Sequence, residues 1–295
     1  MSAHENGAFA PDWLALREGA DAAARSTELL EPLKTALRMP AADGPLVVVD
    51  LGCGTGAMGR WLAPRLAGPQ HWVLYDRDPG LLAHAREGLP EHSADGGPTT
   101  AEPRIGDLAQ LSAADLAGAS LVTASALLDL LTAEQAADLA RACAEAGCPA
   151  LLTLSVEGRV ELEPAHPLDR AVATAFDAHQ RRGTAGGRLL GPDAPAVTAA
   201  AFERSGARVH DRPSPWRLGA DDAALTAEWL RGRVSAAVEQ RPDLADAASA
   251  YLDQRLEQCA AGRLHARIGH RDLLAVPARP GDPPPAPDPQ QPAAP

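Results

Sequence analysis

The chain has 295 residues, 45% of them hydrophobic, and a formal net charge of −12. This length suits one large domain with a single core. The acidity disfavours a nucleic-acid partner, because phosphates would be repelled at long range unless a local basic patch met them.

The cysteines and the apolar runs exclude further classes of protein. Cys53, Cys143, Cys148 and Cys259 lack the spacing of a metal site, which predicts free thiols in a reducing cytoplasm and no bound metal. No stretch approaches the roughly 20 apolar residues of a membrane span. The N-terminus also lacks a charged-then-apolar signal segment, so we expect a cytoplasmic protein without a membrane partner.

The first predicted element is a helix within residues 11–38, part of a helical cap at 1–43. Asp12 is placed to cap the helix, and Arg17, Asp21 and Arg25 follow at i, i+4 and i+8 spacing. Such a ladder is typical of a solvated ion-pair face. The alternative is a lid whose arginines bind a ligand carboxylate, because the planar guanidinium suits that group.

Residues 46–56 combine a buried strand with a glycine-rich turn. Four apolar, mostly β-branched residues at 46–49 predict a short parallel strand. Asp50 ends it, and three glycines at alternate positions lead into a helix that begins near Ala57. Glycine allows unusual backbone angles and a close ligand approach, and the start of a helix presents unpaired N–H groups. Together these features predict a nucleotide-sized site with one carboxylate at its edge.

The next two strands also lead to acidic residues. Residues 71–75 predict a strand that ends at Asp76, and a Gly/Pro/Ser/Thr-rich connection at 93–103 precedes a strand end at 104–105. A carboxylate at the end of the strand after a glycine turn can accept both hydroxyls of a ribose. The alternative role for Asp76, capping the next helix, suits Asp78 better because it directly precedes Pro79.

The glycine turn can be aligned with two ligand-binding patterns. The dinucleotide fingerprint G-x-G-x-x-G/A fits Gly52, Gly54 and Ala57, but this signal alone is weak. A hydrophobic strand followed by Asp-x-Gly-x-Gly-x-Gly from Asp50 to Gly56 resembles instead the first motif of the class I S-adenosylmethionine-dependent methyltransferases.

That resemblance implies S-adenosylmethionine as the cofactor. It places the ribose at Asp76, the adenine at the Gly-Asp pair after the third strand, and the methionyl part at the end of a fourth strand, 120–124. The alternative role for Asp107 is to cap a short helix that begins at Leu108. The residues assigned to the cofactor are Asp50, Gly52, Cys53, Gly54, Gly56, Asp76, Arg77, Asp107, Leu108 and Ser125.

Strands and helices alternate in the rest of the chain. We expect helices at 132–145 and 196–205 and strands at 150–156, 207–210 and 269–277. The pattern predicts an α/β fold, a doubly wound, mostly parallel sheet with helices on both faces. The resemblance adds that the sheet has seven strands with the last one antiparallel, in a domain at 44–278. Residues 279–295 are predicted to be a disordered Pro-rich tail.

Two segments, 157–195 and 212–267, are additional to the core and are expected to form an acceptor lid over the carboxyl ends of the strands. His179 is the candidate general base, because histidine titrates near neutrality, although most of the nine histidines will be surface or packing residues. Arg17, Arg25 and Arg181 are candidates to bind a substrate carboxylate. Trp216 is a candidate wall of an apolar pocket, with a place in the core as the alternative.

The predicted activity is methyl transfer from S-adenosylmethionine to a small-molecule acceptor at oxygen, either a hydroxyl or a carboxylate. Relatives that methylate the exocyclic amines of nucleobases usually carry an Asp/Asn-Pro-Pro-Tyr/Phe run after the fourth strand, and here residues 125–128 read Ser-Ala-Leu-Leu. The alternatives are an RNA or protein methyltransferase, a non-catalytic cofactor-binding module, and a nicotinamide oxidoreductase.

Overall fold

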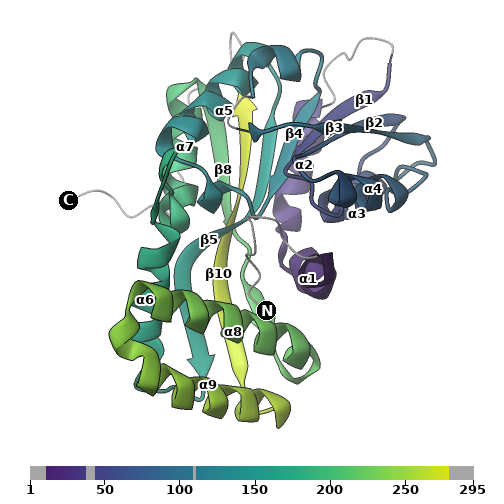
Figure 1. The fold of residues 1–295 in the computed structure, drawn as a ribbon. Helices are drawn as coiled ribbons and strands as arrows, with labels where there is room; N and C mark the ends of the chain where they lie inside the picture. Colours follow the sequence, from purple (N-terminus) through teal and green to yellow (C-terminus); the bar gives the residue numbers. More distant parts are fainter. Residues whose placement is uncertain (1–10, 38–43, 109–110, 279–295) are drawn as a thin grey trace.

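A computed structural model describes residues 11–37, 44–108 and 111–278 (Figure 1). Its centre is a sheet in the order β3-β2-β1-β4-β5-β10-β8, with the short β9 beside β10. The strands are β1 (Leu46–Leu51), β2 (Gln70–Asp76), β3 (Thr99–Ile105), β4 (Leu121–Ser125), β5 (Ala150–Glu163), β8 (Ala207–Pro213), β9 (Trp216–Leu218) and β10 (His265–Pro277). Neighbours among the first five pair in parallel, and β10 is antiparallel to β5 and β8. The predicted doubly wound sheet with an antiparallel last strand is confirmed. The predicted number of seven strands was wrong, because β9 pairs with the extension of β10 as an eighth strand among the described residues.

Alternate side chains of the strands fill a core on each face of the sheet. On one face Val48 and Trp72 pack with residues of α2 (Leu30–Leu37), α3 (Ala57–Leu62) and α4 (Pro79–Glu87). On the other face Val49 and Val73 belong to the core that includes α5 (Ala133–Ala146) and α7 (Ala194–Arg204). Because helices cover both faces, a ligand is expected at the carboxyl ends of the strands.

The long strands β5 and β10 extend beyond the core sheet and carry a group of helices (Figure 1). These helices are α6 (Asp169–Gln180), α8 (Ala223–Gln240) and α9 (Ala245–Ala260). Leu162 of β5, Ile268 of β10 and Trp216 of β9 pack with Leu225 and Leu230 of α8. A short hairpin, β6 (Gly183–Thr184) and β7 (Gly187–Arg188), follows α6 in the glycine-rich part of the chain. The two additional segments therefore build one helical layer beside the carboxyl ends of the strands.

A buried carboxylate on β10 fastens this extension to the N-terminal part of the chain. Asp272 is 1% exposed. It accepts hydrogen bonds from the backbone N–H of Leu154 and of Ser26, each at 2.8 Å, and from the hydroxyl of Ser214 at 2.5 Å. The pairing of β10 with β5 shifts register at this point. Asp272 thus holds the irregular part of the sheet next to the loop that follows the first helix.

Several predicted boundaries were wrong. β3 begins at Thr99, inside the expected connection, and Pro103 is tolerated there because β3 is an edge strand. β5 continues past residue 156 and β10 begins before residue 269, because each extension pairs with the other. The predicted tail at 279–295 lies outside the described residues, as do residues 1–10 and 38–43 of the cap. No helix in the part of the chain that the structure describes is long and apolar enough to cross a membrane.

Candidate active site

The turn between β1 and α3 is left-handed at all three of its glycines. The φ angles are 60° at Gly52, 54° at Gly54 and 86° at Gly56, a region in which a side chain is strained. A Cβ on Gly56 would also lie 2.9 Å from the Cα of Ala85 in α4. The turn therefore needs glycine for its conformation and, at Gly56, for the close approach of α4.

The carboxylate of Asp76 holds this turn against the end of β2. Its Oδ2 accepts a hydrogen bond from Gly54 N–H at 2.9 Å, and its Oδ1 accepts one from Asp78 N–H at 3.1 Å. Each carboxylate oxygen has lone-pair capacity beyond one hydrogen bond. Asp76 can therefore fix the backbone of the turn and still accept hydrogen bonds from a ligand.

The turn forms one wall of a cavity of about 260 Å³, which we call the glycine-turn cavity. Nine of the ten residues that the sequence assigns to the cofactor line it: Asp50, Gly52, Cys53, Gly54, Asp76, Arg77, Asp107, Leu108 and Ser125. Gly56, the N-cap residue of α3, is the exception. The sequence prediction thus grouped residues from four strand ends that the fold brings to one place.

Two buried charged groups in this cavity have unsatisfied hydrogen-bonding atoms. Asp50 accepts a hydrogen bond from Thr123 Oγ1 at 2.7 Å on one oxygen, and its Oδ2 has no partner among the described residues. Burial raises the pKa of Asp50 to about 7. Arg25, 3% exposed, donates through Nη2 to Ser125 Oγ at 3.1 Å, while its Nε and Nη1 have no partner within that same part of the chain. A ligand with one carboxylate and one ammonium group would complement this pair.

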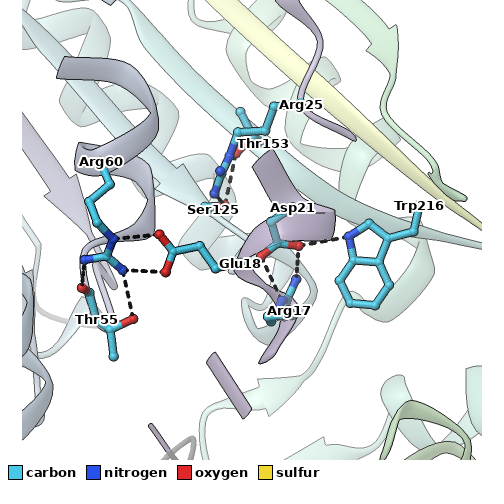
Figure 2. A network of polar contacts seen from close by, with 9 residues as sticks. All are labelled: Arg17, Glu18, Asp21, Arg25, Thr55, Arg60, Ser125, Thr153 and Trp216. Atoms are coloured by element: carbon cyan, nitrogen blue, oxygen red, sulfur yellow. Dashed lines mark hydrogen bonds and ion pairs between the residues drawn. The ribbon is translucent and has the colours of Figure 1, made fainter. Parts of the chain in front are cut away.

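The predicted Arg-Asp-Arg ladder lies on α1 (Pro11–Ala24) and the residue after it (Figure 2). Arg17 donates to both carboxylate oxygens of Asp21, at 2.9 and 3.2 Å, and Trp216 Nε1 donates to the same carboxylate at 2.9 Å. Asp21 is 5% exposed and the guanidinium of Arg17 lies 5.0 Å from the Trp216 ring centroid. The interpretation of the ladder as a solvated ion-pair face was wrong, because its side chains are buried between α1 and the rest of the protein.

A second ion pair ties α1 to the glycine turn (Figure 2). Arg60 of α3 donates to both carboxylate oxygens of Glu18 at 2.6 and 2.7 Å, and also to the carbonyl oxygen of Thr55. Leu14 and Arg17 on the same helix line the glycine-turn cavity. The first helix therefore lies across the opening of that cavity and is held from two sides.

A second cavity, of about 410 Å³, lies between α1, the extensions of β5 and β10, and helices α6 and α8; we call it the helix-lined cavity. Its wall shares Arg17, Ala126 and Leu130 with the glycine-turn cavity. The two cavities therefore adjoin, and the chain after β4 separates them.

The structure distributes the predicted substrate residues between these places. His179 and Trp216 line the helix-lined cavity, and Nε2 of His179 lies 3.3 Å from a carboxylate oxygen of Glu239. Arg25 lines only the glycine-turn cavity and Arg17 lines both. Arg181 lines neither: its guanidinium forms a two-point ion pair with Asp193, at 2.6 and 2.7 Å.

Sequence analysis missed the polar residues that follow β4. Asp129 lines the helix-lined cavity, and its carboxylate accepts a hydrogen bond from its own backbone N–H. Burial raises the pKa of Asp129 to about 6. Ala126 and Leu154, the non-glycine residues with positive φ in the described chain, at 51° and 57°, line the same cavity. Backbone strain of this kind often accompanies a functional site, and an acid just after a parallel strand was the available signal in the sequence.

Comparison with known proteins decides between the ligand classes that use such a turn. Residues 48–149 match the family model described as a methyltransferase domain. This range starts in β1 and includes the glycine turn, β2, β3 and β4. Residues 48–149 are thus similar to a methyltransferase domain.

Solved methyltransferase structures overlap with the chain at low identity. A candidate methyltransferase of Bacillus halodurans has 16% identity and a TM-score of 0.47, with 84% of this chain and 100% of that one covered. A methyltransferase of Thiobacillus denitrificans in complex with S-adenosylhomocysteine has 18% identity and a TM-score of 0.42, with 90% and 98% covered. A methyltransferase of Geobacter sulfurreducens in complex with the same ligand has 19% identity and a TM-score of 0.41, with 91% of this chain and 99% of that one covered. No curated protein matches the chain.

Proposed function

We propose that this methyltransferase transfers the methyl group of S-adenosylmethionine to a hydroxyl oxygen of a small molecule held in the helix-lined cavity. The observation that carries the proposal is the shared wall of the two cavities, Arg17, Ala126 and Leu130. S-adenosylmethionine supplies a methyl group that is already activated. The main task of the protein is therefore to align the acceptor with the methyl group and the sulfur. This alignment can lower the activation free energy by roughly 7–11 kcal/mol.

We assign the glycine-turn cavity to the cofactor because its polar groups fit the parts of that molecule. Asp76 would accept the ribose hydroxyls, and Asp107 with the backbone N–H of Leu108 would bind the adenine. The unpartnered nitrogens of Arg25 and the unpartnered oxygen of Asp50, judged within the described residues, complement the carboxylate and ammonium of the methionyl part.

Asp129 is the general base that we favour for a hydroxyl acceptor. It lies in the segment that separates the cavities, next to Leu130, which lines both. A carboxyl group with a pKa of about 6 is mostly ionised at neutral pH and still binds a proton well enough to accept one from a hydroxyl. His179 is the second candidate, because it lines the same cavity beside Glu239.

The helix-lined cavity also bears on the alternative functions. A non-catalytic cofactor-binding module would be expected to have a filled or sealed acceptor site, whereas this cavity has a volume of about 410 Å³. That volume lies within the range of small-molecule pockets. The net charge of −12 argues against RNA as the acceptor.

The test is to incubate the protein with a cell extract and S-adenosylmethionine that carries an isotopic label in the methyl group. We expect mass spectrometry to find labelled O-methyl products among small molecules, and turnover that rises with pH through about 6. Asp129→Asn should lower turnover by roughly 100-fold or more, and His179→Asn by much less. Label recovered in RNA or protein, or normal turnover of Asp129→Asn, would contradict the proposal.

A further inference from the structure

A buried guanidinium lies in the wall of the helix-lined cavity without a carboxylate in contact. Arg233 of α8 is 6% exposed, and its Nη2 has no hydrogen-bond partner among the described residues. Within that part of the chain, no acidic oxygen lies within ion-pair distance of Arg233. Burial lowers the pKa of its side chain, because the charged form has lost water. A buried guanidinium with an unpaired N–H group is unfavourable unless a hydrogen-bond acceptor binds it.

Aromatic rings hold this guanidinium in place. Its central carbon lies 4.6 Å from the ring centroid of Phe176 and 5.3 Å from that of Trp229, and both rings also line the cavity. Stacking of this kind orients a guanidinium but leaves the hydrogen bonds of its N–H groups unmade. Arg233 is therefore positioned in advance, with its donors still available.

The acidic groups near Arg233 do not neutralise it through contact. Asp169, one of its charged neighbours, is already bound by Arg255 at 2.6 and 2.7 Å and by the hydroxyl of Tyr251 at 2.8 Å. Asp177 is the other acid. Burial raises its pKa, and one of its oxygens has no hydrogen-bond partner among the described residues. Both acids thus act on Arg233 from a distance, and neither forms an ion pair with it in the described part of the chain.

We propose that Arg233 binds a carboxylate on the methyl acceptor, so that the substrate is a planar, apolar acid that also carries the hydroxyl to be methylated. This inference rests on the proposed function, which places the acceptor in the helix-lined cavity. The rings of Trp13, Phe176, Trp216 and Trp229 give that cavity its aromatic wall. The charged neighbours of Asp129 are Arg17 and Arg182 rather than Arg233, so the anchor and the base lie in different parts of the cavity.

The test compares three probes of the same shape and different charge on the full chain saturated with S-adenosylhomocysteine. The probes are 3-phenylpropionate, its neutral amide and 3-phenylpropylamine, titrated by calorimetry. The wild type should bind the carboxylate at least about tenfold more tightly than the amide or the amine. Arg233→Met should remove this preference. Arg241→Met is the matched control, because Arg241 directly follows the same helix, is exposed, and is paired with Asp243, which lines neither cavity, and it should keep the preference.

A second variant gives a result that does not depend on the folding of Arg233→Met. Asp177→Asn removes the competing negative charge beside Arg233, and it should raise the affinity for 3-phenylpropionate by roughly two- to tenfold. Four results would each overturn the role of Arg233 as the carboxylate anchor. In the wild type these are equal binding of the three probes or tighter binding of the amine. In the variants they are a preference that survives Arg233→Met or a weaker carboxylate complex in Asp177→Asn.

The probe titration tests the role of Arg233 separately from the proposed methyl transfer. Arg233 lies outside the glycine-turn cavity, so Arg233→Met should bind S-adenosylhomocysteine as the wild type does. Cofactor binding and labelled O-methyl products without carboxylate discrimination would overturn the anchor alone. Absent cofactor binding would contradict the proposed function instead.

Discussion

Asp50 stands at the end of β1 with one oxygen bonded to Thr123 and the other without a partner in the described chain. Its carboxyl is fully buried, and this burial is the largest cause of its raised pKa. Arg25 nearby acts in the opposite direction, because a cation favours the ionised form. At the scale of single residues, the charge state of the glycine-turn cavity therefore depends on a group that titrates near neutrality.

Cofactor affinity is accordingly expected to depend on pH. An ammonium group binds the ionised form of Asp50, so affinity for S-adenosylhomocysteine should rise as the pH increases through about 7. In Asp50→Asn the dependence should be largely absent and binding weaker throughout. Calorimetric titration of both proteins at several pH values measures this, and identical slopes for the two would exclude Asp50 as the titrating group.

The same group affects the stability of the ligand-free protein with the opposite sign. The pKa of Asp50 is about 7 in the folded state against an ordinary value of 3.8, so the folded protein binds this proton more tightly than the unfolded chain. The contribution of Asp50 to stability is therefore lost as the pH rises from about 4 to 7.

The backbone of the glycine turn is tightly constrained by its left-handed conformation and by the helix packed against it. Gly56 has a φ of 86°, it is the N-cap of α3, and α4 lies close to its Cα. Gly68 offers a matched comparison, because its φ is 84° but a Cβ there would meet nothing within 4 Å. The difference between the stability losses caused by alanine at the two positions therefore measures the cost of the contact between the turn and α4.

Substitution by alanine should separate these effects. Gly68→Ala should lower the free energy of unfolding by about 1–2 kcal/mol, the cost of a left-handed alanine. Gly56→Ala should lower it by about 2–4 kcal/mol, because Ala85 must also move. Urea denaturation measures both. Equal losses would show that the approach of α4 imposes no additional constraint.

The parts of the fold that the sequence predicted are those encoded by neighbouring residues. The apolar run of β1, the glycines after it and the acid at the end of β2 lie within about 30 residues, and the parallel sheet brings them together by its geometry. The extensions of β5 and β10 could not be predicted in this way, because each exists only by pairing with a distant segment. Asp129 and Arg233 were missed for the same reason, since their place in a cavity depends on helices that are far apart in the chain.

One helix contributes residues to both the glycine-turn cavity and the helix-lined cavity. The α1 helix contributes Leu14 to the glycine-turn cavity, Trp13 to the helix-lined cavity and Arg17 to both. Its Glu18 is paired with Arg60 beside the glycine turn, and Asp21 is bonded to Trp216 of β9. The relative position of cofactor and acceptor therefore depends on how this helix docks.

The assignment of the glycine-turn cavity to the cofactor depends most on Asp76. If its carboxylate receives both ribose hydroxyls, Asp76→Ala removes two charge-assisted hydrogen bonds, roughly 2–4 kcal/mol. This corresponds to about 30- to 1000-fold weaker binding of S-adenosylhomocysteine. Asp95→Ala is the matched control, because Asp95 also accepts hydrogen bonds from backbone N–H groups, those of Gly68 and Gly97, and lines neither cavity.

Calorimetric titration of the wild type, Asp76→Ala and Asp95→Ala with S-adenosylhomocysteine is the most direct test. We expect tight binding to the wild type, unchanged affinity in Asp95→Ala, and a loss of about 30- to 1000-fold in Asp76→Ala, with the variant still folded by circular dichroism. Equal affinity of Asp76→Ala and the wild type would remove Asp76 from the cofactor site. Absence of binding to the wild type would show that the glycine-turn cavity is not a site for this cofactor.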